Sequence, residues 1–134
     1  MTEEQKRHNR RWKGQDRLER ILKDIAGRRN VFSELRLAGA LGPNGGLLEY
    51  DFYIPALGVL VEYNGEEHYR YIPHFHKGKR DFEYRVLCDR MKEEYAREAG
   101  LILVVFTYEE PLTAVHVAAR LGEAIRGAHA PGKE

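Results

Sequence analysis

The sequence predicts an α/β domain in which helices flank a single mixed β-sheet. Residues 50–69, YDFYIPALGVLVEYNGEEHY, contain two apolar segments around a tight turn, which is the pattern of a β-hairpin. Apolar stripes with helical spacing precede and follow this hairpin. A continuous apolar run at 101–106 suits a strand that is buried on both faces. The expected order of elements is therefore αβββαβα.

The N-terminal third contains an expected arm, a helix and a strand. Residues 1–11 lack apolar periodicity, so we expect a mobile basic arm there. A helix should follow from about residue 12 and end near Gly27. Its inward stripe consists of Leu18, Ile21, Leu22 and Ile25. VFSELRL at 31–37 alternates as a strand, and residues 41–46, LGPNGG, form a turn into the hairpin.

The hairpin register follows if Ala56 and Leu57 form the turn between Pro55 and Gly58. The opposed pairs are then Asp51 with Glu62, Tyr53 with Leu60, and Glu49 with Asn64. The opposite face is expected to be core and consists of Tyr50, Phe52, Ile54, Val59, Val61 and Tyr63. The register therefore predicts two carboxylates side by side on one face.

The second half of the chain should complete the sheet and cover it. Residues 65–80 are irregular, and 81–99 should form a helix whose inward residues are Leu87, Met91 and Tyr95. The strand at 101–106 follows, and a helix at 112–125 closes the fold. We expect one domain over 12–127 and a flexible tail over 128–134.

Composition excludes several protein classes. A chain of 134 residues is large enough for one core and too small for two. It contains no apolar run long enough to span a membrane and no secretory signal near the N-terminus, which predicts a cytoplasmic protein. The lone Cys88 cannot form an internal disulfide, and its apolar helical surroundings predict a buried thiol in a reducing compartment.

The pair of Asp51 and Glu62 is the main candidate for chemistry. Directly opposed Cβ atoms lie roughly 4.5 to 5.5 Å apart, where like charges repel and weaken the sheet. Such a pair suits a hard divalent ion such as Mg²⁺ or Mn²⁺, with the carbonyl of Tyr63 as a further oxygen ligand. Metal-assisted phosphodiester hydrolysis is then the first hypothesis. In the alternative, one carboxylate points to solvent and pairs with an arginine.

The motif around this pair resembles the PD-(D/E)XK nuclease superfamily. Asp51 ends one strand, and Glu62 in the next strand is followed by Asn64, Gly65 and His68, then by a helix and a Gly-hydrophobic strand. The resemblance extends from Trp12 to Tyr108. It is greatest to the branch of very short patch repair endonucleases and related phage or mobile-element enzymes.

The resemblance implies a restriction-endonuclease-like αβββαβ core and a site that binds divalent metal. Asp51 and Glu62 would be the ligands, and a further carboxylate would come from Glu19 on the first helix. Glu34 is a rival for that third carboxylate. Metal-dependent cleavage of DNA is the activity that the resemblance implies.

The chain also departs from the superfamily pattern. Asn64 stands where a lysine usually follows the strand glutamate, and Glu67 stands where glutamine often precedes the histidine. His68 is the expected substitute for the missing lysine as a general base, and Lys92 is the second candidate. Asp89 and Lys92 either support the site or form an ordinary i,i+3 ion pair.

Basic residues gather in two segments despite a net charge of only +1. We expect both segments to neutralise DNA phosphates, although basic tails also increase solubility. These residues are Lys6, Arg7, Arg10, Arg11 and Lys13 in the first segment, and Lys77, Lys79 and Arg80 in the second. A domain this small, with one active site, would need a homodimer to cut both strands.

Three histidines, His68, His74 and His76, raise a zinc alternative. A structural zinc site normally needs four ligands, and the only thiol lies far along the next helix. His74 and His76, together with Tyr69, Arg70 and Tyr71, are instead expected to line a DNA groove. The sequence thus predicts a metal-dependent DNA endonuclease. The alternatives are a catalytically silent DNA-binding module with the same fold and a zinc-stabilised interaction domain.

Overall fold

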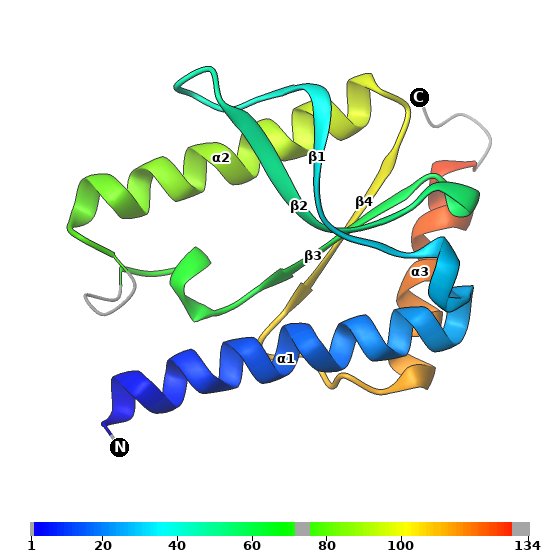
Figure 1. The fold of residues 1–134 in the computed structure, drawn as a ribbon, viewed down its shortest axis with the longest axis horizontal. Coiled ribbons are helices and arrows are strands. Elements are labelled where there is room, and N and C mark those ends of the chain that lie inside the picture. Colours follow the sequence, from blue (N-terminus) through cyan, green and yellow to red (C-terminus); the bar gives the residue numbers. More distant parts are fainter. Residues whose placement is uncertain (1, 72–75, 130–134) are drawn as a thin grey trace.

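The computed structural model describes residues 2–71 and 76–129. Its four strands form one mixed sheet in the order β1-β2-β3-β4 (Figure 1). Their bounds are β1 (Phe32–Leu41), β2 (Leu47–Ile54), β3 (Val59–Asn64) and β4 (Ile102–Thr107). The first three strands are antiparallel, whereas β3 and β4 are parallel. The predicted α/β class with a single mixed sheet is confirmed.

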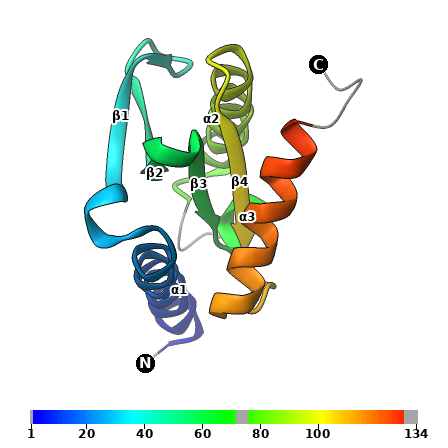
Figure 2. The same ribbon diagram turned by 90° about the vertical axis from the view of Figure 1, so that its right-hand side faces the viewer.

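Helices cover both faces of this sheet (Figures 1 and 2). They are α1 (Glu3–Ala26), α2 (Lys79–Glu98) and α3 (Ala114–Ala128), and short 3₁₀ turns occur at η1 (Arg28–Asn30), η2 (Pro55–Leu57) and η3 (Glu66–His68). Helices α1 and α3 pack on one face, and α2 packs on the other. The observed order of helices and strands is the predicted αβββαβα.

Helix α1 begins earlier than the sequence pattern predicts. Residues 3–11, expected as an arm, continue the helix, because the side chain of Thr2 accepts a hydrogen bond from the Gln5 amide and the side-chain oxygen of Gln5 accepts one from the Thr2 amide. This capping box, followed by good helix formers, supports a helix that lacks an apolar stripe. At the other end, α3 extends to Ala128, and 130–134 lie outside the described residues.

The hairpin between β2 and β3 has the predicted register. Tyr53 pairs with Leu60, and the η2 turn ends at Gly58, whose φ of 66° is left-handed. The predicted pairing of Glu49 with Asn64 is wrong. Glu49 instead pairs with Arg36 on β1, because the ladder between β2 and β3 covers only residues 52–54 and 59–61.

The sheet separates the core into two clusters, one on each of its faces. Phe52, on the α1 and α3 face, packs with Leu18 and Leu22, as predicted. Tyr50 is fully buried but belongs to the α2 face, where its hydroxyl donates to the Lys92 carbonyl at 2.9 Å. The expectation that Tyr50 shares a face with Phe52 is therefore wrong, because β2 leaves β3 between these residues.

Helix α2 packs on the sheet with two of its three predicted inward residues. Met91 and Tyr95 pack inward as predicted, together with the partly buried Cys88. Leu87, predicted to be inward, is exposed. None of the helices in the described part of the chain is long and apolar enough to cross a membrane.

Candidate active site

Asp51 and Glu62 lie where β2 and β3 separate, and each carboxylate accepts a hydrogen bond from the opposite strand. The Asp51 amide donates to Glu62 Oε2 at 2.7 Å, and the Tyr63 amide donates to Asp51 Oδ2 at 2.8 Å. These side-chain bonds take over where the backbone ladder stops at Phe52 and Val61. The predicted juxtaposition of the two carboxylates is confirmed, and its cause is this exchange between separating strands.

Lys92 of α2 completes the site. Its Nζ lies 2.5 Å from Glu62 Oε1, and both side chains are largely buried, at 15% and 5% exposure. Burial by itself lowers the pKa of Lys92, but the charges of Glu62, Asp51 and Asp89 outweigh it, so the pKa is raised. Lys92 is therefore positively charged in the folded protein. Its positive charge offsets the repulsion between the adjacent carboxylates of Asp51 and Glu62.

The pKa of Asp51 is raised to about 7. Burial is the main cause and the Glu62 charge the second, while the Tyr63 amide and Lys92 act in the opposite direction. An additional cation beside Asp51 would favour its ionised form, because opposite charges stabilise a carboxylate. Two adjacent carboxylates, those of Asp51 and Glu62, are the kind of oxygen donors that suit Mg²⁺ or Mn²⁺, so the residues present fit one such ion.

The predicted third carboxylate is not part of this pair. Glu19 faces β1, where its Oε2 lies 2.6 Å from Lys23 Nζ and accepts from Ser33 Oγ at 3.2 Å. Its hydrogen bond with Lys23 lowers its pKa. Glu34, the rival, is exposed on β1 at a φ of 52°. In the described chain, no three His, Cys, Asp or Glu residues form a group that could hold a metal.

His68 packs against α2. Its Nδ1 lies 2.8 Å from Asp89 Oδ2, and Arg85 Nη1 lies 3.5 Å from its Nε2. The expectation that His68 turns back over Asp51 and Glu62 is wrong, because η3 carries it to α2 instead. Lys92, the second candidate, is the residue that reaches the carboxylates. The proposed i,i+3 ion pair is also wrong, because Asp89 binds His68 and Lys92 binds Glu62.

Arg85 is a site residue that the sequence analysis missed. It approaches His68, and its Nε is buried without a hydrogen-bond partner in the part of the chain that the structure describes. Arg85, Asp89 and Lys92 are spaced i, i+4 and i+7 on α2, so they share one helix face. This spacing of charged residues along one helix face was the sequence signal that could have identified Arg85 as a site residue.

A cavity of about 310 Å³ adjoins the pair of Glu62 and Lys92. It lies between α2 and the carboxyl ends of β3 and β4. Its lining consists of Glu62, Asn64, Tyr69, Asp89, Lys92, Glu93, Leu103, Val105 and Thr107. A second cavity, of about 320 Å³, lies on the β2 side of the same two α2 residues, Asp89 and Lys92. The candidate site is thus open to ligands on both sides of Lys92.

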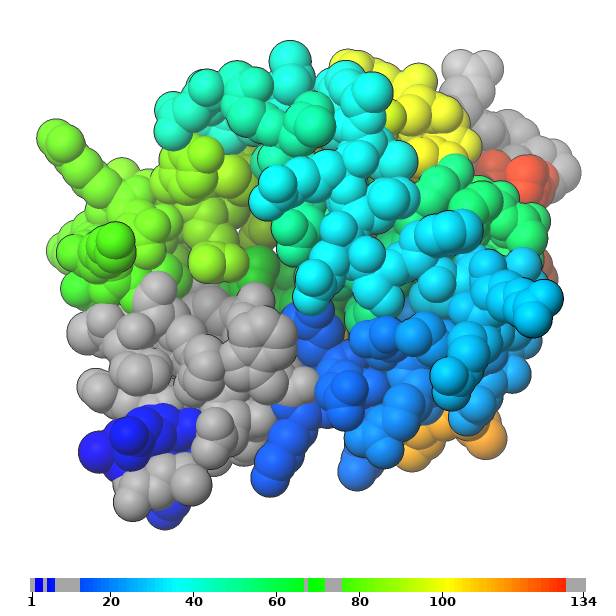
Figure 3. Space-filling model, viewed as in Figure 1, coloured from blue at the N-terminus to red at the C-terminus, as the bar shows by residue number. Residues whose placement is uncertain are grey.

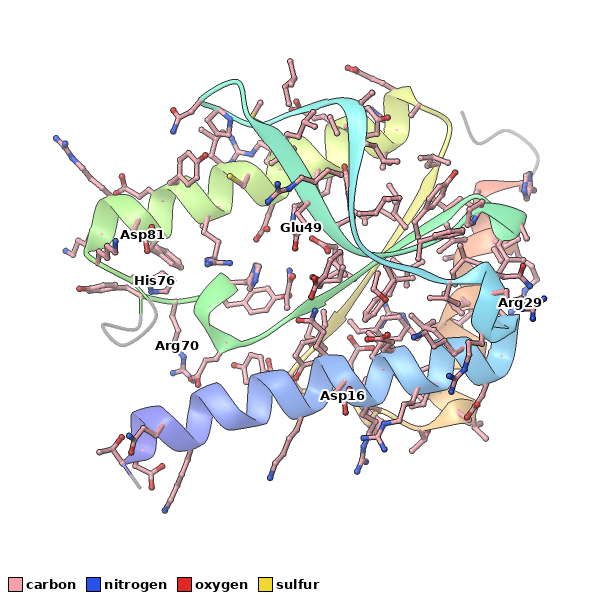
Figure 4. The ribbon with its side chains drawn as sticks, in the orientation of Figure 1. Asp16, Arg29, Glu49, Arg70, His76 and Asp81 are labelled. Carbon is pink, nitrogen blue, oxygen red and sulfur yellow. The ribbon has the colours of Figure 1, made fainter. Side chains whose placement is uncertain are left out.

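The predicted DNA-binding residues whose side chains the structure describes lie on α1 and at the start of α2. Lys13 is exposed on α1, and Lys77, Lys79 and Arg80 are exposed at the start of α2. Lys6 is exposed and lies 3.4 Å from Glu3. The N-terminal ends of α1 and α2 lie at the same end of the molecule, with Arg70 between them (Figures 1 and 4). The side chains of Arg7, Arg10 and Arg11 lie outside the described residues.

The predicted histidine surface is only partly present. His76 is buried between the rings of Tyr71 and Phe82, so the expectation that it contacts DNA is wrong. His74 lies outside the described residues. Tyr69 and Tyr71, by contrast, are exposed, as a DNA-facing role requires.

The chain is similar to viral proteins of uncharacterised function. It is 41% identical over 68 residues to Uncharacterized protein 307L of Invertebrate iridescent virus 6, covering 50% of this chain and 34% of the relative. It is 35% identical over 86 residues to Uncharacterized protein 094L of Frog virus 3 (isolate Goorha), covering 63% and 54%. The chain thus spans about a third to a half of these curated relatives. No family model and no solved structure matches.

Proposed function

We propose that this protein is a metal-dependent DNA endonuclease that hydrolyses phosphodiester bonds. The observation that carries the proposal is the buried arrangement of Asp51, Glu62 and Lys92. Two adjacent carboxylates and one lysine combine a site for a divalent cation with a group that can contact a phosphate or an attacking water. The similarity to viral proteins fits a viral or mobile-element enzyme.

The roles of the residues follow from their positions. Asp51 and Glu62 would hold Mg²⁺ or Mn²⁺, with the Tyr63 carbonyl as a further oxygen ligand. A bound ion would lower the pKa of water and stabilise charge on the phosphate. Lys92 is the residue of this chain that would donate a hydrogen bond to the scissile phosphate or orient the attacking water.

His68 takes a positioning role in this proposal. Its hydrogen bond with Asp89 holds η3 against α2, the helix that carries Lys92. Because Asp89 also contributes to the raised pKa of Lys92, this bond tunes the lysine indirectly. His68 therefore acts through Asp89 and not on the attacking water.

DNA is the substrate that the charge distribution favours. The exposed lysines and arginine at the start of α2 lie at the same end of the molecule as the N-terminal end of α1 (Figure 1), and Lys13 is exposed further along α1. Such groups bind backbone phosphates without reading sequence. One site per chain cuts one strand, so nicked circles should form first, and a homodimer would be required for paired cuts.

The test is cleavage of supercoiled, linear, branched and single-stranded DNA with Mg²⁺, Mn²⁺ or EDTA. We expect metal-dependent nicking that Glu62→Gln abolishes and that Lys92→Met lowers roughly a hundredfold or more, the scale of a lost proton-transfer or charge-stabilising group. His68→Ala should lower the nicking rate much less than Lys92→Met does. The matched control is Glu49→Gln, which changes an exposed carboxylate on β2 paired with Arg36.

Two results would redirect the proposal. DNA binding without metal-dependent cleavage would favour the catalytically silent DNA-binding module. Full activity in Lys92→Met together with a large loss in His68→Ala would restore His68 as the general base.

A further inference from the structure

The cavity beside Glu62 has a composition that selects against phosphate. Three carboxylates line it, those of Glu62, Asp89 and Glu93, against the single ammonium group of Lys92. Leu103 and Val105 contribute apolar surface to the same lining. A phosphate inside would meet like charges, whereas a flat neutral group with N–H donors would find both apolar surface and acceptors.

The size of the cavity also suits a small ligand. At about 310 Å³ it lies at the lower end of the range for pockets that hold small molecules. It lies at the carboxyl ends of the parallel strands β3 and β4, where Asn64 and Thr107 add polar groups. Open α/β sheets commonly bind ligands at this edge.

One exposed tyrosine lines this cavity, and the ring of a second lies beside it. Tyr69 forms part of the lining and is 50% exposed. Its ring lies 6.2 Å from that of Tyr108, which is 38% exposed and follows β4. Contiguous exposed apolar surface in a groove is a feature of ligand-binding sites. Tyrosine rings stack on nucleobases, each of which has a π face, whatever the sequence.

We propose that this cavity binds one unpaired nucleobase of the DNA substrate, with Tyr69 stacking on it. The inference rests on the proposed function and names its substrate class: DNA that carries an unpaired nucleotide, as in a bulge, flap or single strand. A fully paired duplex cannot fill the cavity unless a base leaves the stack, which costs a few kcal/mol.

The experiment measures DNA affinity in EDTA by fluorescence anisotropy, so that cleavage plays no part. The probes are a duplex, the same duplex with a one-nucleotide bulge, and the bulged duplex with an abasic site in place of the extra base. Wild type should bind the bulge at least tenfold more tightly than the duplex or the abasic probe, because one stacked base contributes roughly 1–3 kcal/mol. Tyr69→Ala should abolish this advantage, and Tyr69→Phe should retain it.

The control variant is Tyr84→Ala, which removes a ring of similar exposure, 41%, from the other side of α2. It should leave the preference for the bulge unchanged. Equal affinity of wild type for the three probes, or an equal loss on all three in Tyr69→Ala, would overturn the inference. A Tyr69-dependent preference without metal-dependent nicking would support the base site and reject the nuclease. Metal-dependent nicking without a preference for the bulge would support the nuclease and reject the base site.

Discussion

Lys92 and Glu62 form an ion pair of 2.5 Å although they are 30 residues apart in the chain. The pair joins α2 to β3 at the point where β2 separates from β3. Because both side chains are largely buried, each charge depends on the other for compensation. The same contact thus affects both the stability of the fold and the chemistry of the site.

Removing one member of this pair should cost more than removing both. Lys92→Met leaves Glu62 buried without its cation, and the loss of stability should be about 3–5 kcal/mol. Lys92→Met combined with Glu62→Gln removes both charges and should recover much of that loss. Urea denaturation of the wild type, both single variants and the double variant measures the coupling. A double variant less stable than Lys92→Met would contradict the prediction.

Asp51→Asn should stabilise the metal-free protein at neutral and alkaline pH. The pKa of Asp51 is raised from 3.8 to about 7 in the folded state. The folded state therefore holds the proton more tightly, and stability falls as pH rises from about 4 to about 7. Asparagine does not ionise, so its advantage in Tm should grow over that window and stay constant above it. Thermal melts in EDTA at pH 5 and pH 8 check this.

A divalent metal ion should stabilise the wild type more than it stabilises Asp51→Asn. Divalent ions bind the folded state and raise its melting temperature, and a neutral amide is a poorer ligand than a carboxylate. We therefore expect Mn²⁺ to raise the Tm of wild type and to affect Asp51→Asn much less. Equal shifts in the two proteins would show that Asp51 is not a metal ligand.

The basic residues at the start of α2 should contribute to DNA binding through phosphate contacts. Replacing Lys77, Lys79 and Arg80 with glutamine should flatten the plot of log affinity against log salt by up to about 2 to 3, because each duplex phosphate contact adds about 0.9. The matched control replaces the exposed Arg28 and Arg29 of η1, at the opposite end of the molecule (Figure 4). That change should leave the slope unaltered. Similar slopes in both variants would mean that DNA does not bind preferentially at the end of the protein where α2 begins.

Gly14 should be required where α1 approaches β3. A Cβ at Gly14 would lie 2.5 Å from the Tyr63 ring, which is only 5% exposed and has little room to move. Overpacking of this kind typically costs 1–3 kcal/mol, against about 1 kcal/mol gained in helix propensity. Gly14→Ala should therefore lower the Tm. Gly122→Ala in α3, which meets only the flexible end of Arg126, should keep or raise it. A higher Tm for Gly14→Ala would refute the close approach.

The space-filling view shows which segments cover this face of the molecule (Figure 3). The β1–β2 hairpin lies over part of α2, and α1 passes along the opposite side of the molecule (Figure 3). Lys92 and Glu62 come from α2 and β3, which are far apart in the sequence, so the helix must dock on the sheet before Lys92 can contact Glu62. The packing of Met91 and Tyr95 against the sheet therefore sets the geometry of the candidate site.

The sequence by itself determined the features that depend on near neighbours. The order of helices and strands, the turn before Gly58 and the pairing of Tyr53 with Leu60 all follow from local patterns. The adjacency of Asp51 and Glu62 follows too, because a two-strand register is set by its turn. Each of these features is set by residues that lie close together in the sequence.

Only the tertiary structure decided which groups join the carboxylates. In the sequence, Lys92 was one of several candidates. The docking of α2 on the sheet brings it to Glu62, whereas Glu19 contacts Lys23 and His68 contacts Asp89. Periodicity defines which side of a helix faces inward, but not its rotation to within one residue, as exposed Leu87 shows. The partner of a buried charge is chosen by long-range packing, because compensation requires contact in space and not proximity in sequence.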